Sequence, residues 1–451
     1  MLNKAKKVFI IGIKGVAMAN LAVILKKMGK VVSGCDVEEE FITDGLLKKH
    51  KISYTIGFKP RSLQEETDLV IYSAAHSGIH NPIAVEAQKK RIPVVSQAEV
   101  LGGLMKQFKT TIAVSGCHGK TTTSSLLSYA LIQLGAKPSY LVGAPSFNDY
   151  DGGDFNRKDY FVIEADEYGV NPPNDLRPKF HFLNPDYIIC TNIDFDHPDV
   201  YKNLEDTKKA FLKFFGGKKL ILCADDPNLP HLGTTYGFLK SADYVISHMQ
   251  TNETGTTFSL RGNDFTISLF GEKNVSNAAA VIVMLLELGF PLEKIQAAIK
   301  GFTGAKRRFE KVFENTNYSL YDDYGHHPHE IEATISAARK HFPNRRIIVV
   351  FQPHTYSRTQ MLLKDFAKAL SLADYSYILP IFSSAREDAS KFSITSEDII
   401  KAGAKNSESV HSNRQLISQL KPRLEKKDVI FTMGAGDVYK LQKDIIRLVK
   451  S

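Results

Sequence analysis

Short apolar runs alternate with amphipathic segments along the first hundred residues. Runs of this kind predict strands buried on both faces, as in a parallel sheet covered by helices. The runs lie at residues 8–11, 30–34, 69–72 and 93–95. Residues 18–28 have the 3.6-residue spacing of a helix. The pattern therefore predicts a parallel sheet of βα units.

A second set of elements begins at residues 110–114, an apolar strand that runs into a glycine turn and then a helix from Thr121 to Leu134. We expect further strands at 160–163 and 187–190, an antiparallel hairpin from the alternating residues 251–270, and a helix from Asn274 to Leu288.

A third alternating set starts near Tyr318. Its expected strands lie at 318–322, 346–351, 375–379 and 429–432, and its helices at 329–341 and 360–372. The chain is therefore predicted to be three consecutive α/β domains, with ranges 1–107, 108–312 and 313–451.

Composition narrows the class of protein. At about 150 residues per domain, 451 residues agree with three domains. A content of 43% hydrophobic and 24% charged residues excludes a disordered or fibrous chain. The net charge of +9 fits anionic ligands such as phosphates, but the basic residues are dispersed, so we expect no nucleic-acid partner.

The four cysteines form no CxxC pair and no zinc spacing, which favours reduced thiols and a cytoplasmic protein. The basic start, the apolar residues 8–25 and Cys35 resemble a lipoprotein leader. Lys14 interrupts that apolar run, however, and three lysines separate it from Cys35, so we interpret it as part of a folded domain. No segment has the roughly 20 apolar residues of a membrane helix, so we expect no membrane partner.

The strongest local motif follows the strand at 110–114 and opens a helix. Glycines let the backbone approach phosphate oxygens, the helix N-terminus presents free N–H groups, Lys120 adds a charge and Thr121 can ligate magnesium. Val114 stands where the standard loop has its first glycine. We predict phosphate binding rather than an ordinary turn, by Ser115, Gly116, Cys117, His118, Gly119, Lys120, Thr121 and Thr122.

Acidic and imidazole groups follow two later strands, at Glu164–Glu167 and at Asn192–His197. Neighbouring ends of parallel strands are adjacent, and ligands bind at that carboxyl edge. These groups suit a magnesium ion, although acidic loop tips that cap helices are the alternative.

The first strand is followed by Gly12 and Gly15, and the second ends at Asp36. This imitates a dinucleotide fingerprint, but Lys14 and Ala17 occupy the other glycine positions. A diphosphate site stays plausible, with Lys14 offsetting the phosphate charge.

The third domain places further titratable groups at strand ends. They occur in Asp322–Pro328, in Phe351–Thr359 and after the last strand in Gly434–Asp437. We interpret the clusters as lying on adjacent strands and forming a site, rather than as polar helix entries.

With these motifs the sequence resembles the Mur ligases over essentially its whole length. Residues 116–121 match the family's Gly-Thr-x-Gly-Lys-Thr loop, with Cys117 in the threonine place; the matching motifs of the third domain are Asp-Asp-Tyr-Gly-His-His-Pro, Phe-Gln-Pro-His-x-Tyr-x-Arg-Thr and Met-Gly-Ala-Gly-Asp. The resemblance implies a Rossmann-like first domain, a P-loop ATPase-like central domain and a Rossmann-like third domain.

It further implies a cytoplasmic, ATP-dependent and Mg²⁺-dependent enzyme of peptidoglycan precursor synthesis, a monomer or homodimer. Such an enzyme joins L-alanine to the lactyl carboxylate of UDP-N-acetylmuramate through an acyl phosphate. Alternatives are addition of a tripeptide to the same sugar nucleotide, a non-catalytic nucleotide-binding protein, and a NAD-dependent dehydrogenase.

The resemblance also assigns residues to roles. Catalysis would involve Lys120, His197, Glu164 and His327, and magnesium would be held by Thr121, Glu164 and His197. Besides residues 115–122, ATP would contact Asn274, Arg308 and Asp323. The UDP-sugar would contact Gly12, Gly15, Asp36 and Ser73, and the amino acid Tyr324, His327, His354 and Arg358.

Three departures from the family pattern bear on these roles. Lys273 replaces a histidine beside the adenine, Thr355 stands where an arginine is common, and Lys14 alters the first glycine loop. They put the adenine packing, the choice of amino acid and the pose of the uridine diphosphate in question.

Overall fold

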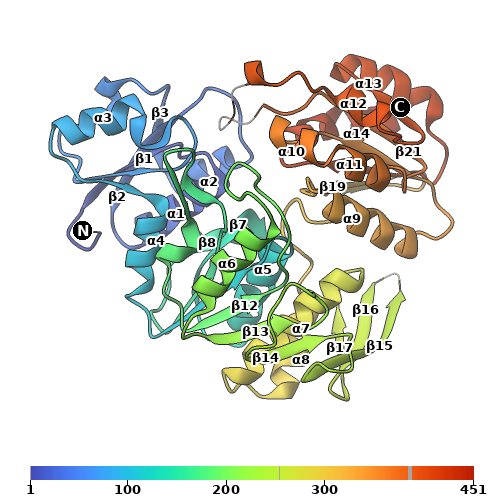
Figure 1. Cartoon of the computed structure of the whole chain (residues 1–451), viewed down its shortest axis with the longest axis horizontal. Helices are drawn as coiled ribbons and strands as arrows, with labels where there is room; N and C mark the ends of the chain where they lie inside the picture. Colours follow the sequence, from blue (N-terminus) through green and yellow to red (C-terminus); the bar gives the residue numbers. More distant parts are fainter. Residues whose placement is uncertain (1, 253, 384–386, 388, 451) are drawn as a thin grey trace. The chain divides into compact units, whose positions relative to one another are not determined.

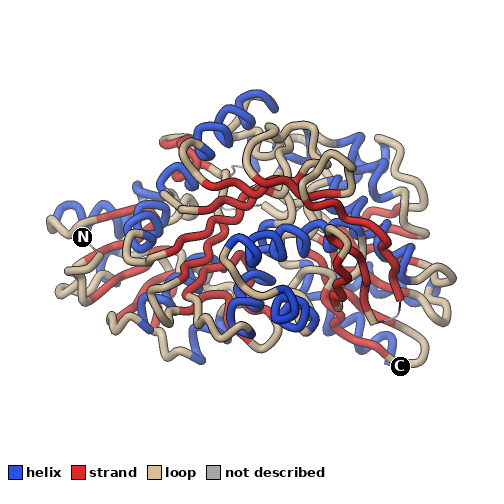
Figure 2. Tube along the Cα trace, turned by 90° about the horizontal axis from the view of Figure 1, so that it is seen from below, coloured by secondary structure: helices blue, strands red, loops and turns tan. Residues whose placement is uncertain are grey.

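The computed structural model of the chain describes residues 2–252, 254–383, 387 and 389–450. It divides into two compact units, which are described separately. The first unit contains residues up to 249 together with 257–268 and 276–305, and the second contains 250–256, 269–275 and 306 onward. Figure 1 labels the elements along the chain, and Figure 2 distinguishes the strands from the helices around them.

The first unit begins with a five-stranded sheet in the order β3-β2-β1-β4-β5, in which all pairs are parallel. This order is that of one half of a Rossmann fold with its neighbouring strands. The strands are β1 (Lys7–Ile11), β2 (Val31–Asp36), β3 (Ser53–Ile56), β4 (Leu69–Tyr72) and β5 (Val94–Ser96). The helices are α1 (Val16–Lys27), α2 (Asp44–Lys49), α3 (Pro82–Lys89) and α4 (Gln97–Met105).

A ten-stranded sheet follows, in the order β17-β16-β15-β14-β13-β12-β6-β9-β7-β8. Its strands are β6 (Thr110–Ser115), β7 (Ser139–Phe147), β8 (Tyr150–Asp154), β9 (Tyr160–Glu164), β12 (Tyr187–Cys190), β13 (Lys219–Cys223), β14 (Thr234–Gly237), β15 (Tyr244–Asn252), β16 (Gly255–Leu260) and β17 (Asn263–Ile267). A separate hairpin pairs β10 (Gly169–Asn171) with β11 (Asp175–Pro178). The helices are α5 (Lys120–Gln133), α6 (Leu204–Phe215), α7 (Glu272–Glu287) and α8 (Leu292–Lys300).

Helix α1 joins these two sheets into one unit, because it packs against the β7–β8 hairpin (Figure 1). Asn20 is fully buried and donates its amide to the carbonyl oxygens of Val142 and Ala144, both at 2.9 Å. A Cβ on Gly153 would lie 2.5 Å from the Asn20 carbonyl oxygen, so the hairpin approaches the helix at a distance that only glycine permits.

The second unit is built around a six-stranded sheet in the order β18-β19-β23-β20-β21-β22, antiparallel at β18 and otherwise parallel. Its strands are β18 (Glu310–Glu314), β19 (Ser319–Asp323), β20 (Ile347–Phe351), β21 (Tyr375–Ile378), β22 (Ser407–Ser409) and β23 (Val429–Met433). The helices are α9 (Pro328–His341), α10 (Tyr356–Met361), α11 (Leu363–Leu370), α12 (Ser396–Lys401), α13 (Asn413–Leu420) and α14 (Gln442–Lys450).

Strand β20 shows why the central strands are continuously apolar. Ile347, Val349 and Phe351 enter one hydrophobic cluster, whereas Ile348 and Val350 enter another on the opposite face. Successive side chains of a strand point to opposite faces, so a sheet covered on both sides requires apolar residues at every position.

The predicted fold class of three consecutive α/β domains is confirmed. The pattern missed the half-exposed β3, the β7–β8 hairpin, the short β10 and β11, and strand β15. The helix expected at 360–372 is two helices, which meet at Leu362. Strand β18 spans the boundary expected at 312/313, and the division between the compact units falls at 305/306.

Among the described residues, no helix is both long enough and apolar enough to span a membrane. All four cysteines are buried and unpaired by disulfides.

Candidate active site

The loop between β6 and α5 is shaped by two glycines. Gly116 and Gly119 have φ angles of +125° and +86°, which L side chains rarely adopt. A Cβ on Gly116 would lie 2.2 Å from Thr191 Oγ1. Beside it, the backbone N–H of His118 donates to Asn192 Oδ1 at 2.9 Å. The end of β12 therefore holds the phosphate loop in place, and α5 begins directly after it, at Lys120.

Lys120 is held at the base of this loop. Its Nζ lies 2.8 and 3.0 Å from the two carboxylate oxygens of Glu167 and 2.5 Å from the Gly116 carbonyl oxygen. Burial opposes the charge of Lys120, but Glu167 outweighs it and the pKa of Lys120 is raised. Burial also raises the pKa of Glu167, to about 7, against the lowering effect of Lys120.

Three donor groups converge beside Lys120. One ligand atom each from Asp166, Glu167 and His197 lies within 4.8 Å of the others. Burial favours the neutral form of Asp166, but Lys179, at 2.7 Å, and Lys120 hold its pKa below the usual range. Carboxylate oxygens with an imidazole nitrogen suit Mg²⁺ or Mn²⁺, so the residues present fit a divalent metal.

This cluster differs in part from the predicted magnesium set. Glu164 accepts a hydrogen bond from the backbone N–H of Gly143 at 2.9 Å and is absent from the convergent group. Asp166 and Glu167 belong to the motif that drew attention to the site but were not among the predicted metal ligands, because the sequence does not tell which carboxylate turns inward. Thr121 is buried in the first turn of α5.

The strand order also corrects one expectation. Strands β9 and β12 are not neighbours, because β6 lies between them. The acidic segment after β9 and the Asn192–His197 segment after β12 therefore flank the phosphate loop on its two sides. In this arrangement Glu167 lies 2.8 Å from Lys120 Nζ and 3.7 Å from His197 Nε2.

The first glycine loop lies at the carboxyl edge of the five-stranded sheet. Gly12 has a φ of +74°, and a Cβ there would lie 3.5 Å from Ser73 Oγ. Gly15 precedes α1 as its N-cap residue. Asp36 is buried and accepts hydrogen bonds from the backbone N–H groups of Lys14 and Val37 at 2.7 and 2.8 Å.

Lys14 does not have the role expected for it. Its side chain is 2% exposed, and Nζ donates to the carbonyl oxygens of Val37 and Glu39 at 2.9 and 2.8 Å. Nζ also lies over the rings of Phe41 and Tyr54. Lys14 thus organises the segment after β2 instead of offsetting a phosphate charge.

In the second unit, Asp323 ends β19 and is buried. It accepts hydrogen bonds from the backbone N–H groups of Phe309 and Gly325, both at 2.8 Å. Burial raises its pKa to about 6, which Arg308 partly counteracts. Arg308 also lies 4.9 Å from the centre of the Tyr324 ring and 3.7 Å from Glu330.

His327 forms the N-cap of α9. Its Nδ1 accepts the backbone N–H of His329 at 3.3 Å, and Glu330 completes a capping box. An acceptor role for Nδ1 leaves the proton of the neutral imidazole on Nε2. Nε2 of His327 is buried, so the structure shows this residue in its helix-capping contact, and its catalytic role stays a prediction.

The remaining amino-acid candidates follow β19 and β20. The His326 and His354 rings are 6.0 Å apart, and Tyr324 lies 5.3 Å from His326. Arg358 is buried in α10 and donates to the His354 carbonyl oxygen at 3.4 Å. Thr355 precedes α10 with a φ of +71°. His326 was not among the predicted site residues, although its histidine pair was noticed.

These strands are not adjacent either, because β23 lies between β19 and β20. The glycines after β23 let that segment approach Gln352 closely. A Cβ on Gly434 would lie 2.4 Å from the Gln352 carbonyl oxygen, and one on Gly436 would lie 2.3 Å from Gln352 Oε1. Arg307, which the sequence did not single out, donates to the carbonyl oxygens of both glycines.

Two adenine-side candidates also lie in the second unit. Asn274 donates its amide to the Phe270 carbonyl oxygen at 2.8 Å, which fixes the first turn of α7. Lys273, one of the departures from the family pattern, donates to the His329 carbonyl oxygen at 3.2 Å. The phosphate loop itself belongs to the first unit.

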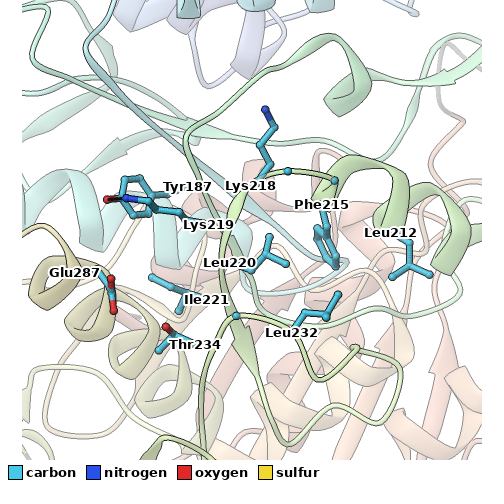
Figure 3. A pocket seen from close by; sticks show the side chains of 13 residues that line it. Tyr187, Leu212, Phe215, Lys218, Lys219, Leu220, Ile221, Leu232, Thr234 and Glu287 are labelled. Atoms are coloured by element: carbon cyan, nitrogen blue, oxygen red, sulfur yellow. Dashed lines mark hydrogen bonds between the residues drawn. The ribbon is translucent and has the colours of Figure 1, made fainter.

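A cavity of about 510 Å³ lies away from these groups (Figure 3). It is lined by Tyr187, Lys219 and Thr234, which begin β12, β13 and β14, and by Leu212 and Leu232. Parallel strands begin at the edge opposite the one where they end, so this cavity is separate from the phosphate loop.

Comparison with protein families places three domains on the chain. Residues 7–109 match the Mur ligase family catalytic domain, residues 114–285 the Mur ligase middle domain, and residues 307–436 the Mur ligase glutamate ligase domain.

Curated relatives match over the full length. The chain is 37% identical to UDP-N-acetylmuramate–L-alanine ligase of Desulfitobacterium hafniense, over 97% of this chain and 98% of that protein. It is 38% identical to the enzyme of the same name from Lactobacillus acidophilus, over 100% of both.

Solved structures show the same architecture. The UDP-N-acetylmuramate–alanine ligase of Thermotoga maritima superposes with a TM-score of 0.82 at 27% identity, covering 98% of this chain and 99% of that one. A murein peptide ligase of Psychrobacter arcticus gives 0.74 at 23% identity, covering 98% of each chain, a likeness of fold alone.

Proposed function

This chain belongs to the Mur ligase family, and we propose that it joins L-alanine to the lactyl carboxylate of UDP-N-acetylmuramate at the expense of ATP. The observation that carries the proposal is the 37–38% identity to alanine ligases over the whole chain. Such an enzyme supplies a precursor of peptidoglycan. We place it in the cytoplasm, where its nucleotide substrates are found, as a monomer or homodimer.

The phosphate loop is the part of the chain suited to the nucleotide. Its glycines hold backbone N–H groups at the start of α5, where the helix dipole favours anions. Lys120 is positioned at the base of the same loop. We assign residues 115–122 to the β- and γ-phosphates, and Asn274, Arg308 and Asp323 to the remainder of ATP.

Magnesium would be held by His197 with Glu167 and Asp166, and Thr121 and Glu164 remain candidates from the family pattern. When bound, the ion neutralises charge on the phosphates during phosphoryl transfer. Lys120 supplies a second cation, so the protein and the ion share the stabilisation of a charge-rich transition state.

The chemistry requires activation of a poor electrophile. The lactyl carboxylate attacks the γ-phosphorus, forms an acyl phosphate and releases ADP. The amino group of alanine then attacks the acyl carbon, loses a proton, and expels phosphate from the tetrahedral intermediate. The guanidinium of Arg358 can pair with the alanine carboxylate. His354 follows β20 and Tyr324 follows β19, and the rings of both lie near that of His326.

Two alternatives explain less of the chain. A NAD-dependent dehydrogenase leaves the phosphate loop and the second unit without a role, and Asp36 already accepts two backbone N–H groups. A non-catalytic nucleotide-binding protein leaves the cluster beside Lys120 unexplained. Addition of a tripeptide instead of alanine is a chemical variant of the same reaction. The murein peptide ligase shares only the fold, at 23% identity, whereas the alanine ligases are 37–38% identical over the whole chain.

The test is phosphate release from ATP on mixing the protein with UDP-N-acetylmuramate and single amino acids. Release with alanine above that with serine or glycine supports the proposal. Release only with a tripeptide would assign the chain to murein recycling, and binding of NAD without ATP hydrolysis would overturn the ligase assignment.

A further inference from the structure

Arg307 is a buried arginine at the strand ends where the amino-acid candidates lie. Only 5% of the residue is exposed, and it has no part in the ATP assignment that includes the neighbouring Arg308. Arginine is almost never fully buried unless it is paired, because burying a charge is costly without hydrogen-bond partners. The partners of Arg307 therefore indicate which parts of the second unit this residue holds together.

The guanidinium of Arg307 connects the ends of two neighbouring strands. Near the end of β19, its Nε donates to Asp322 Oδ2 at 3.1 Å. Directly after β23, its two terminal nitrogens donate to the carbonyl oxygens of Gly436 and Gly434 at 3.2 and 2.6 Å. The donors of a guanidinium form a rigid planar fork, so one side chain fixes these two strand ends relative to each other.

Two tyrosine rings pack against the same guanidinium. Its central carbon lies 5.1 Å from the centre of the Tyr324 ring and 4.8 Å from that of the Tyr439 ring, within the range of a cation–π interaction. The carbonyl oxygen of Arg307 also accepts the backbone N–H of Tyr324 at 2.6 Å. Tyr324, one of the amino-acid candidates, is thus held by Arg307 through both its backbone and its ring.

The turn that Arg307 holds after β23 also supports the surroundings of His354. A Cβ on Gly436 would lie 2.3 Å from Gln352 Oε1 and 2.7 Å from Phe382 Cγ, so this turn packs tightly against both side chains. The Phe382 ring in turn stacks on the His354 ring, with the ring centres 5.6 Å apart and the planes inclined by 13°. A displacement of the turn would therefore alter the packing around His354.

We propose that Arg307 is a positioning residue for the amino-acid site, because one buried guanidinium holds Tyr324 directly and supports His354 through the turn after β23. This inference rests on the proposed function and deepens it, since it names a residue that acts on amino-acid binding through its neighbours. Arg308, which is assigned to ATP, also lies 3.7 Å from Glu330. The position of Arg308 therefore depends less on Arg307 than that of Tyr324 does.

The test is the substitution Arg307→Lys. Lysine keeps a positive charge for Asp322, but it has no planar fork that could bind two carbonyl oxygens and stack on tyrosine rings. Steady-state phosphate release would give kcat and the KM values of alanine, ATP and UDP-N-acetylmuramate. We expect the KM of alanine to rise about tenfold, on the scale of one hydrogen bond to a charged group, and the other three values to change less than about twofold.

Arg346→Lys is the matched control. Arg346 also makes two hydrogen bonds to a buried aspartate, Asp428, at 3.0 and 3.1 Å, but at the edge of the sheet where β20 and β23 begin. This substitution should lower the Tm to an extent similar to that in Arg307→Lys and leave all three KM values unchanged. The comparison separates a positioning effect from a general loss of stability.

A second variant keeps the proposal testable if Arg307→Lys does not fold. The double variant Arg307→Met with Asp322→Asn removes the charges of both partners, and it should show the same rise in the KM of alanine. An unchanged KM of alanine in a folded variant, or an equal rise in all three KM values, would overturn the proposal. A native chain that releases no phosphate with alanine would instead overturn the proposed function.

Discussion

Lys120 and Glu167 form a buried ion pair in which the lysine Nζ lies within 3.0 Å of both carboxylate oxygens. The pair joins the phosphate loop to the segment after β9. It places a cation and a candidate metal ligand side by side, so a change in either residue alters the charge seen by the other.

Replacing Lys120 with alanine should abolish the proposed turnover. Loss of a preorganised cation at a phosphoryl-transfer site is expected to lower kcat by about 10³-fold. Affinity for the sugar nucleotide should stay within about twofold, because that ligand is assigned to the other sheet. Steady-state phosphate release and calorimetry with UDP-N-acetylmuramate measure the two effects.

Lys219→Ala is the matched control, because Lys219 is exposed at the opposite edge of the same sheet. An equal loss of sugar-nucleotide affinity in Lys120→Ala would contradict the assignment of the two ligands to different sheets. The Tm of Lys120→Ala should be measured as well, because removing Lys120 leaves Glu167 buried without its cation.

If Asp166, Glu167 and His197 hold magnesium, the variant His197→Asn should need more Mg²⁺ for activity. Asparagine is compatible with the positive φ of this position, +59°, and removes the imidazole. The Mg²⁺ concentration for half-maximal activity should rise at least tenfold. The exposed His248→Asn is the control, also at positive φ. Equal Mg²⁺ curves for all three proteins would remove His197 from the metal site.

Asp323 predicts a pH-dependent stability. Its pKa is raised from 3.8 to about 6 in the folded chain, because it is buried. Protonation therefore favours folding, and the contribution is complete below pH 3.8 and lost as the pH rises through about 6. Two pKa units correspond to about 3 kcal/mol.

The measurement is the Tm difference between the native chain and Asp323→Asn at several pH values. The native chain should lose stability relative to the variant between about pH 4 and pH 7. The exposed Asp365→Asn is the control substitution. A constant difference between the native chain and Asp323→Asn would show that Asp323 does not titrate in this range.

Asn20→Leu should destabilise the first unit. The substitution leaves the buried carbonyl oxygens of Val142 and Ala144 without their donor, at about 1–3 kcal/mol each. Urea denaturation should show a lower midpoint than in the native chain, whereas exposed Asn413→Leu should change it little. A native midpoint in Asn20→Leu would mean that the α1–hairpin contact contributes little.

The sequence predicted those elements whose apolar pattern is continuous. Strands β1, β6, β20 and β23 were found because both faces are buried, and α5 because a glycine loop precedes it. The exposed or short strands β3, β10 and β11 carry no such pattern. The break at Leu362 has no glycine or proline to announce it.

For the candidate site, the motifs pointed to the strand ends at which these groups lie but not to the order of the strands. A sheet in which β6 lies between β9 and β12 cannot be read from the chain, since strand order depends on long-range packing. For the same reason, the sequence did not show that Glu167 pairs with Lys120, or that Lys14 is enclosed by the segment after β2.

The glycines of the β7–β8 hairpin have a consequence for protein engineering. A chimaera that takes its first hundred residues from another Mur ligase would set a foreign α1 against Gly152 and Gly153. Unless the donor helix has an amide at the position of Asn20 and allows the same close approach, the grafted helix would not pack against the hairpin. Such exchanges should therefore carry the hairpin together with the helix.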